Sequence, residues 1–315
     1  MTGSSRYTYE LGHDVFPVCR ERKSHMHDPV YDTTESAGTA GSKKKSSGSS
    51  RMLYNVILLA LLAVFLYSGY RLLGIASGYL AGRKEYASTA DTYVKKAEPA
   101  ASGTQTGDAA ADPAAPAESA ESTDPPVVPP ISVDFDGLKA VNPEVVGWIY
   151  SEGTIINYPV LRAEDNDKYL HYTMNGSYND GGSIFMDCRC RSDLSELCTI
   201  LYGHHMKDGS MFASLHNYTK SEYYDQHPYM WYLSPRGDYR LDLYAGYLDD
   251  PDADVYDLFT DQAALDEFLL HADGRSNFTR KYDMESIEHI MVLSTCAYEF
   301  NDARYLVVCV PVKVR

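Results

Sequence analysis

The feature that most limits how this chain can fold is the apolar run over residues 52–70, MLYNVILLALLAVFLYSGY. It contains no charged residue. As an α-helix it would span about 28 Å, close to the hydrocarbon thickness of a bilayer. Tyr54, Tyr67 and Tyr70 lie near its ends, where aromatic side chains gather in membrane proteins. The run is too long, and begins too far into the chain, for a cleaved signal peptide. We therefore predict an uncleaved transmembrane signal anchor.

Basic residues on either side of the run predict its orientation. Those closest to it are Lys43, Lys44, Lys45 and Arg51 before the span, and Arg71, Arg83 and Lys84 after it. The cluster before the span is the closer one, and basic flanks stay in the cytoplasm. We expect a single-pass protein of the cell membrane, with its N-terminus cytoplasmic and everything beyond about residue 72 extracellular.

Composition divides the rest of the chain. Residues 1–51 include a stretch over 36–50 made of Ser, Gly, Ala, Thr and a Lys run, which predicts a disordered cytoplasmic tail. Residues 98–130 are rich in Ala, Pro, Ser and acidic residues, which predicts an extended linker. Together with 71–97, which we expect to continue as a helix at the membrane surface, they form a membrane-proximal segment over 71–130. A folded domain is predicted over 131–315.

The domain over 131–315 is predicted to be mainly β. Short aromatic and β-branched runs are separated by Gly, Asn, Asp and Pro. The predicted strands cover 154–161, 183–187, 198–202, 229–233, 239–247, 289–296 and 305–314. Apolar residues at helical spacing predict a helix over 261–271, and a short one is expected over 135–142. Many strands without a βαβ rhythm indicate a closed β-barrel with a few peripheral helices.

Net charge argues against one class of function. The chain carries 28 basic and 44 acidic residues, a net charge of −16. Residues 131–315 hold 15 Lys and Arg against 30 Asp and Glu. A nucleic-acid-binding surface needs a basic face, so no nucleic acid is expected as a partner.

Cys296 is the candidate nucleophile. It ends the predicted strand HIMVLSTC, and the next strand opens at Arg304. If the two strands pair so that partner numbers sum to 600, Cys296 faces Arg304 and Ser294 faces Leu306. Opposed side chains lie about 5 Å apart, and a thiol beside a guanidinium is stabilised as the thiolate. A small apolar cysteine at a strand end is the alternative interpretation.

A second candidate follows the strand LCTILY, which ends in a Gly-His-His turn at Gly203, His204 and His205. A histidine at the end of a barrel strand can donate and accept protons near neutral pH. A surface histidine in a turn is the alternative for either residue. A cysteine together with a histidine favours nucleophilic catalysis.

Other clusters have simpler explanations. A metal site built from Cys188, Cys190, Cys198 and the two histidines fits no standard zinc spacing, so no metal and no cofactor are expected. A disulfide such as Cys188–Cys198 is an open alternative in an extracellular domain. The aspartates over 249–257 lack the EF-hand pattern, which favours a solvated acidic loop over a calcium site.

These motifs together resemble the class B sortases. The resemblance rests on LSTC at 293–296 with Arg304 eight residues later, and on YGHHMKDGSMF at 202–212. It extends to NPEVVGWIYSEGTIINYPVL at 142–161 and GGSIFMDCR at 181–189, so it covers about 131–315. It implies a membrane-anchored cysteine transpeptidase of Gram-positive bacteria on a closed eight-stranded barrel. The domain over 131–315 would then be the sortase catalytic domain.

The resemblance also implies roles for individual residues. Cys296 would be the nucleophile, His204 the general acid and base, and Arg304 the donor to the oxyanion. His204 is preferred to His205 because it follows the glycine directly, as the family's histidine does. Ser294 and Thr295 flank the nucleophile and are expected to bind the sorting signal.

The expected partners are surface proteins or pilins that carry a sorting signal, an amine of peptidoglycan or of a pilin, and the membrane through 52–70. Two other classes of function stay open. One is a membrane-anchored extracellular cysteine protease, and the other is a non-catalytic, membrane-tethered binding barrel.

Overall fold

The computed structural model describes residues 49–97, 128–250, 254–280, 287–297 and 303–315. The predicted disordered tail therefore lies outside the described residues up to residue 48. So does the predicted linker between residues 98 and 127, and the centre of the acidic segment at 251–253. Contacts divide the chain into two compact units, Met1–Ser68 and Gly69–Arg315.

Helix α1 (Ser49–Tyr93) contains the predicted signal anchor and continues well beyond it. It is long and apolar enough to cross a membrane. The side chains over 52–66 that belong to the first unit are exposed, as expected for residues that face lipid rather than protein. The boundary between the two units falls inside this helix, so its last 25 residues belong to the second unit.

The predicted spacer over 71–130 begins as this helix, and the segments on either side of the predicted linker over 98–130 then pair in a small sheet. Strand β1 (Val94–Lys96) pairs antiparallel with β2 (Ile131–Val133). The amide of Ala97 also donates to the carbonyl of Pro130 at 2.9 Å. The described residues on either side of 98–127 therefore lie next to each other.

The last turns of α1 pack on that domain. Tyr86 is 5% exposed, and its hydroxyl donates to the carbonyl of Gly182 at 2.5 Å. The same hydroxyl lies 3.0 Å from the hydroxyl of Ser183, which in turn donates to the carbonyl of Tyr172. The ring of Tyr86 also contacts the ring of Tyr158 edge-on. The end of α1 is thus a structural part of the second unit.

We expect Tyr86→Phe to lower the free energy of unfolding of the second unit by about 1–3 kcal/mol, because a buried carbonyl would lose its donor. Urea unfolding of the full-length protein in detergent micelles would measure it, since both tryptophans, Trp148 and Trp231, lie in barrel strands. Tyr79→Phe is the matched control, because the Tyr79 hydroxyl has no hydrogen bond among the described residues. Equal stability of the two variants would contradict the prediction.

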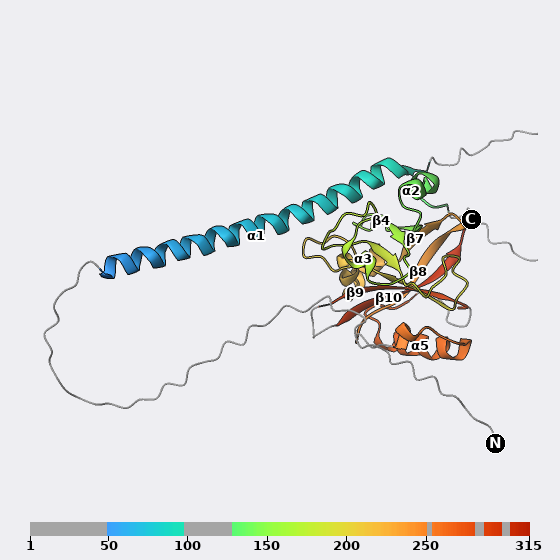
Figure 1. Ribbon diagram of the computed structural model, residues 1–315. Coiled ribbons are helices and arrows are strands. Elements are labelled where there is room, and N and C mark those ends of the chain that lie inside the picture. The colour runs from blue at the N-terminus through green and yellow to red at the C-terminus, as the bar shows by residue number, and fades with distance from the viewer. Residues whose placement is uncertain (1–48, 98–127, 251–253, 281–286, 298–302) are drawn as a thin grey trace, which may run out of the picture. The chain divides into compact units, whose positions relative to one another are not determined.

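Eight strands close into a barrel in the order β10-β8-β7-β3-β4-β5-β6-β9 (Figure 1). Their bounds are β3 (Val145–Tyr150), β4 (Asn157–Leu161), β5 (Ile184–Met186), β6 (Cys198–Tyr202), β7 (Tyr229–Ser234), β8 (Gly237–Asp249), β9 (Ile290–Cys296) and β10 (Arg304–Lys313). Neighbouring strands are antiparallel except β4–β5 and β6–β9, which are parallel. The prediction of a mainly β, closed eight-stranded barrel is confirmed.

Each predicted strand forms a strand of this barrel, with ends that differ by at most a few residues. The predicted strand over 154–161 begins only at Asn157, because residues 151–156 form a turn closed by the amide of Ser151 and the carbonyl of Ile156. Strand β3 was not among the predicted strands. Its sequence VVGWIY is buried on both faces and lacks the period-two alternation of a half-exposed strand.

The other helices lie between the strands in the sequence. Besides α1, the described helices are α2 (Phe135–Val141), α3 (Lys168–His171), η1 (Ala213–Thr219), α4 (Ser221–Gln226), η2 (Asp254–Asp257) and α5 (Gln262–Arg275). Helix α5 matches the helix predicted over 261–271 and lies along the outside of the barrel (Figure 1). Asp261 caps it by accepting from the amide of Ala264, and it buries Leu265, Phe268, Leu269 and Ala272.

Alternation along β9 and β10 separates two faces. Met291 and Leu293 in β9, and Tyr305 and Val307 in β10, belong to the hydrophobic core cluster. Because side chains in a strand alternate, Ser294, Cys296 and Arg304 point to the other face. These three candidate site residues therefore lie on the face away from the barrel core, at the end where β9 stops and β10 begins.

Candidate active site

The pairing of β9 with β10 places Cys296 directly opposite Arg304. Ser294 faces Leu306 and Val292 faces Val308, so the register predicted from the sequence is confirmed. The amide of Ala297 donates to the carbonyl of Ala303 at 2.8 Å and closes the base of the connecting loop. A thiol and a guanidinium are thus neighbours on one face of the barrel end.

The pairing of β6 with β9 brings His204 to the same place. Tyr202 is the partner of Ser294 in this parallel pair, and the amide of Gly203 donates to the carbonyl of Ser294 at 3.2 Å. His204 follows two residues after Tyr202, just beyond the end of β6, and Cys296 follows two residues after Ser294, at the end of β9. The charge of Arg304 acts on His204. His204, Cys296 and Arg304 therefore lie at the same end of three adjacent strands, β6, β9 and β10, although they are far apart in the sequence.

His204 is held by the end of α3. Its Nε2 lies 2.9 Å from the carbonyl oxygen of Leu170, and a carbonyl only accepts, so Nε2 carries the proton. In the neutral ring Nδ1 is then the nitrogen that can accept a proton. Burial lowers the pKa of His204, and the hydrogen bond to Leu170 offsets part of this effect. Neutral imidazole is therefore favoured in the resting protein.

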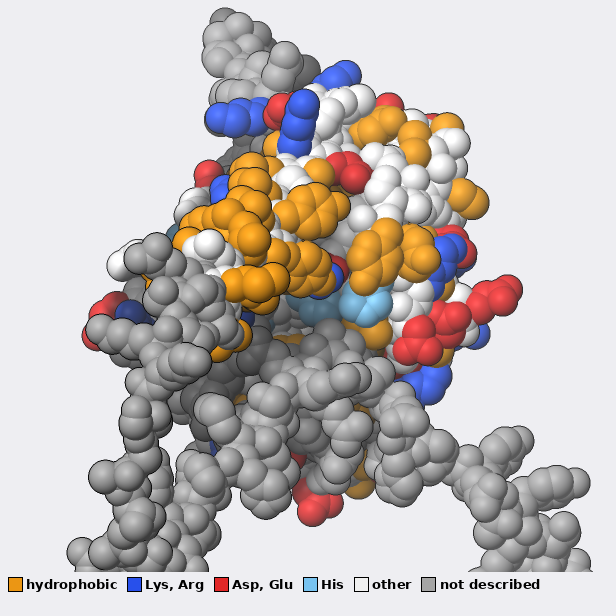
Figure 2. All heavy atoms as spheres, turned by 60° about the vertical axis from the view of Figure 1, so that its left-hand side comes forward, with side chains coloured by type: hydrophobic (Ala, Val, Ile, Leu, Met, Phe, Trp, Pro, Cys, Tyr) orange, Lys and Arg blue, Asp and Glu red, His pale blue; other side chains and the backbone are white. Residues whose placement is uncertain are grey.

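His205 has a role that the sequence pattern did not indicate. Its Nδ1 donates to the carbonyl of Cys296 at 2.9 Å, so it ties the histidine turn to the residue that carries the thiol. Its ring also contacts the ring of His216, with centroids 5.7 Å apart. On the face shown in Figure 2, histidine side chains reach the surface beside hydrophobic side chains. His205 is a positioning residue for the end of β9.

The turn after the two histidines has a local cause in the sequence KDGS. Asp208 Oδ1 accepts from the amide and the hydroxyl of Ser210, at 3.0 and 2.6 Å. Gly209 lies in the left-handed region with φ at 82°, which glycine adopts at little cost. The chain then returns, and the amide of Phe212 donates to the carbonyl of His204 at 3.0 Å. This return fixes the backbone of His204.

Arg304 is 7% exposed and lies between two strands. Its partner in β8 is Asp249, whose carboxylate accepts from Arg275 Nη1 at 2.6 Å. Its own Nη1 lies 3.3 Å from the carbonyl oxygen of Ala303. Asp249 therefore forms an ion pair with Arg275 and acts as a structural residue.

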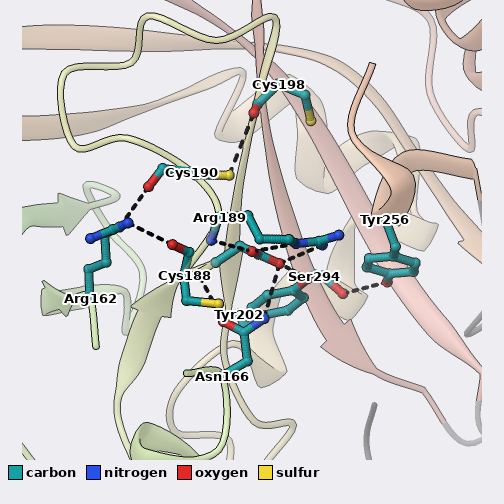
Figure 3. Close-up of polar contacts among 10 residues, drawn as sticks. Arg162, Asn166, Cys188, Arg189, Cys190, Cys198, Tyr202, Tyr256 and Ser294 are labelled. Carbon is teal, nitrogen blue, oxygen red and sulfur yellow. Dashed lines mark hydrogen bonds and ion pairs between the residues drawn. The ribbon is translucent and has the colours of Figure 1, made fainter. Parts of the chain in front are cut away.

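The two predicted substrate-binding residues lie on opposite faces of β9. Ser294 shares the face of Cys296, and its hydroxyl lies 2.8 Å from the hydroxyl of Tyr256 (Figure 3). Burial raises the pKa of Tyr256 to about 12, so it stays a neutral hydrogen-bonding group. Thr295 is opposite Tyr305 on the core face, and its hydroxyl has no partner among the described residues. Their role in binding stays a prediction, and this geometry favours Ser294.

A buried carboxylate supports the strand that leads to His204. Asp187 is fully buried and accepts from Arg189, at 2.9 Å, and from the hydroxyl of Tyr202, also at 2.9 Å (Figure 3). Burial opposes its ionisation, but the hydrogen bonds and charge of Arg189 outweigh this and lower the pKa of Asp187. The Tyr202 ring in turn stacks on Tyr256, with centroids 6.3 Å apart.

Among the described residues, the cysteines outside the site are free thiols. Cys188, Cys190 and Cys198 form no disulfide, so the alternative of a Cys188–Cys198 bridge is wrong for this structure. The thiol of Cys190 instead donates to the carbonyl of Cys198, and the three sulfur atoms lie apart in Figure 3. Among the described residues, no group of three or more His, Cys, Asp or Glu could hold a metal ion.

Comparisons with known proteins agree with this fold. No protein-family model matches the chain. The chain is 34% identical to sortase B of Listeria monocytogenes over 165 residues, which are 51% of this chain and 66% of that protein. It is 33% identical to sortase B of Staphylococcus aureus over 183 residues, which are 57% of this chain and 75% of that protein.

Solved structures give the same result. A crystal structure of sortase B from S. aureus matches with a TM-score of 0.54 and 32% identity, over 57% of this chain and 87% of that one. The sortase B of Clostridium perfringens matches with a TM-score of 0.52 and 26% identity, over 57% of this chain and 100% of that one. The closed barrel is thus a sortase barrel. The chain belongs to the class B sortases.

Proposed function

We propose that this protein is a cysteine transpeptidase that cleaves a sorting signal on secreted surface proteins and transfers the acyl group to an amine of the cell wall or of a pilin. The observation that carries the proposal is that Cys296 lies opposite Arg304 and that His204, on which the charge of Arg304 acts, follows the end of the neighbouring strand β6. These are the nucleophile, proton carrier and oxyanion donor that acyl transfer requires. Relatives support it, since solved sortase B structures include a substrate complex and a complex with Gly3.

In the first half of the reaction, the Cys296 thiolate attacks a backbone carbonyl of the signal. A carbon–sulfur bond forms, and the carbonyl oxygen becomes an oxyanion that Arg304 stabilises. His204, protonated on both nitrogens, gives the proton on Nδ1 to the departing amine as the carbon–nitrogen bond breaks. The Nε2–H group keeps its hydrogen bond to the Leu170 carbonyl, so the ring of His204 keeps its orientation during the transfer.

In the second half, the acceptor amine attacks the thioester. His204 Nδ1 takes a proton from this amine, the new amide bond forms, and Cys296 leaves as a thiolate. Protonated His204 and the thiolate must be present together at the start of each cycle. Because burial lowers the pKa of His204, only a part of the molecules has the required charges near neutral pH.

Mass spectrometry separates this function from its two rivals. The full-length protein in detergent micelles would be incubated with peptides that carry candidate sorting signals, with and without triglycine. A transpeptidase forms an acyl-enzyme on Cys296 and, when triglycine is present, an amide product. A cysteine protease gives the free acid at equal rates with and without triglycine. A binding barrel gives no cleavage, and either of these last two outcomes would refute the proposal.

The proposal includes the membrane topology, with residues 52–70 crossing the membrane, the N-terminus in the cytoplasm and the barrel outside. Support comes from the basic flank before the span and from the length of α1. Protease added to intact spheroplasts is expected to digest the barrel and to spare residues 1–51. Antibodies against tags at the two ends of the chain would measure this. A protected barrel would reverse the assigned orientation.

A further inference from the structure

Helix α3 holds His204 in two independent ways, although it is only four residues long. The carbonyl of Leu170 accepts the Nε2 proton of His204. The next residue, His171, places its ring against the ring of His204, with centroids 6.2 Å apart and planes at 25°. The first contact fixes the orientation and tautomer of His204, and the second forms a wall along one side of its ring.

His171 is itself supported on its other side. Its ring stacks on Tyr178, with centroids 5.7 Å apart and planes at 24°. The backbone of this loop is paired, because Tyr172 bridges to Tyr178 and the amide of Asn179 donates to the carbonyl of His171 at 2.8 Å. Nδ1 of His171 is buried and has no hydrogen-bond partner among the described residues. Three rings, Tyr178, His171 and His204, therefore form one stack that ends at the candidate proton carrier.

Charge couples the two histidines. The charged and titratable groups that act on His204 are His171 on α3, Asp180 before β5 and Arg304 on β10. Positive charge on His171 or Arg304 opposes protonation of His204, whereas Asp180 favours it. An imidazole can be neutral or positively charged, whereas a guanidinium is always charged.

We propose that His171 is a positioning residue that holds the ring of His204 and, when its own ring is positively charged, opposes a second proton on His204. The kinetic consequence rests on the proposed transpeptidase function, whereas the coupling between the two rings does not. A positive charge on His171 would disfavour a second positive charge beside it on His204. The stack therefore keeps His204 neutral, with Nδ1 ready to accept a proton from the acceptor amine.

The direct test is a histidine NMR titration of the full-length Cys296→Ala protein in detergent micelles, with ¹³C at the ring Cε1 position. The His204 signal would be assigned by its loss in His204→Asn. The His171→Phe variant keeps a stacked aromatic ring but removes the imidazole, the group that can carry a positive charge. The titration midpoint of His204 is expected to rise by roughly 0.5–1 pH unit, the effect of one charge at this separation in a solvated site. An unchanged midpoint would overturn the proposal.

His227→Phe is the matched control, since His227 also contacts a tyrosine ring, that of Tyr223, with centroids 4.6 Å apart, but is not among the groups around His204. It is expected to leave the His204 midpoint unchanged. An equal shift in both variants would mean that the effect is not specific to the stack, and would also overturn the proposal.

Kinetics on the Cys296 protein add a second readout. The limb of the pH profile of kcat/KM that follows the protonation of His204 is expected to move up in His171→Phe by the same amount as the midpoint, with kcat at the optimum within about threefold of wild type. In His171→Ala, which lacks the ring wall, kcat should fall about tenfold with little change in KM. Equal losses in both variants without a shifted limb would show a purely structural role and refute the proposal. If the titration midpoint of His204 shifts as expected but the protein shows no transpeptidation, only the proposed function is refuted.

Discussion

Cys296→Ala is expected to lose at least about 1,000-fold in transpeptidation, with no detectable acyl-enzyme, while the barrel stays folded. Cys296 ends β9 opposite Arg304, and Nδ1 of His205 donates to the backbone carbonyl of Cys296. Alanine keeps the backbone and these contacts but cannot form a thioester. Initial rates of peptide transfer to triglycine would measure the loss, and the circular dichroism spectrum would check the fold.

Cys188→Ala is the matched control, because Cys188 is also partly exposed but lies outside the row of site residues. It should keep full activity. Near wild-type activity in Cys296→Ala would refute the assignment of the nucleophile.

Alkylation adds evidence from the unaltered thiol. In a Cys19→Ala background, iodoacetamide should modify Cys296 first, with parallel loss of activity. Burial raises the pKa of Cys190 to about 11, and it also raises the pKa values of Cys198 and Cys309, so these thiols should react slowly. Activity that survives complete modification of Cys296 would contradict the mechanism.

Arg304→Lys is expected to reduce kcat by roughly 30- to 1,000-fold, equal to about 2–4 kcal/mol of transition-state stabilisation, although the positive charge is kept. Arg304 is almost buried and held between β8 and β9, so its planar fork is oriented before the substrate arrives. A lysine ammonium is a compact, strongly hydrated charge on a flexible stem and cannot reproduce this fork. The loss should appear in kcat with little change in KM, because the contact forms with the oxyanion.

Arg280→Lys serves as the control, since Arg280 forms an ion pair with Asp273 on α5, away from the site. Steady-state kinetics of both variants would decide between two roles for Arg304. If it only stabilised the thiolate by its charge, Arg304→Lys would keep most of its activity, and the assignment of the oxyanion donor would be wrong.

The sequence determined the elements whose pattern is local. The uncharged span over 52–70 predicts a membrane-crossing helix from its length and composition alone. Short aromatic and β-branched runs located β9 and β10, and the assumed register, in which partner numbers sum to 600, places Cys296 opposite Arg304. Apolar residues at helical spacing located α5. In each case the information lies within a few residues, so it can be read without the tertiary structure.

The structure decided what depends on contacts between distant segments. The sequence pattern did not show that Tyr86 bonds to Gly182, that the two ends of the linker meet in β1 and β2, or that His205 holds the carbonyl of Cys296. The tautomer of His204 likewise depends on the carbonyl of Leu170, which is 34 positions away. Folding brings these groups together by closing the barrel, and the side chains that surround a charged group, rather than its neighbours in sequence, set its protonation.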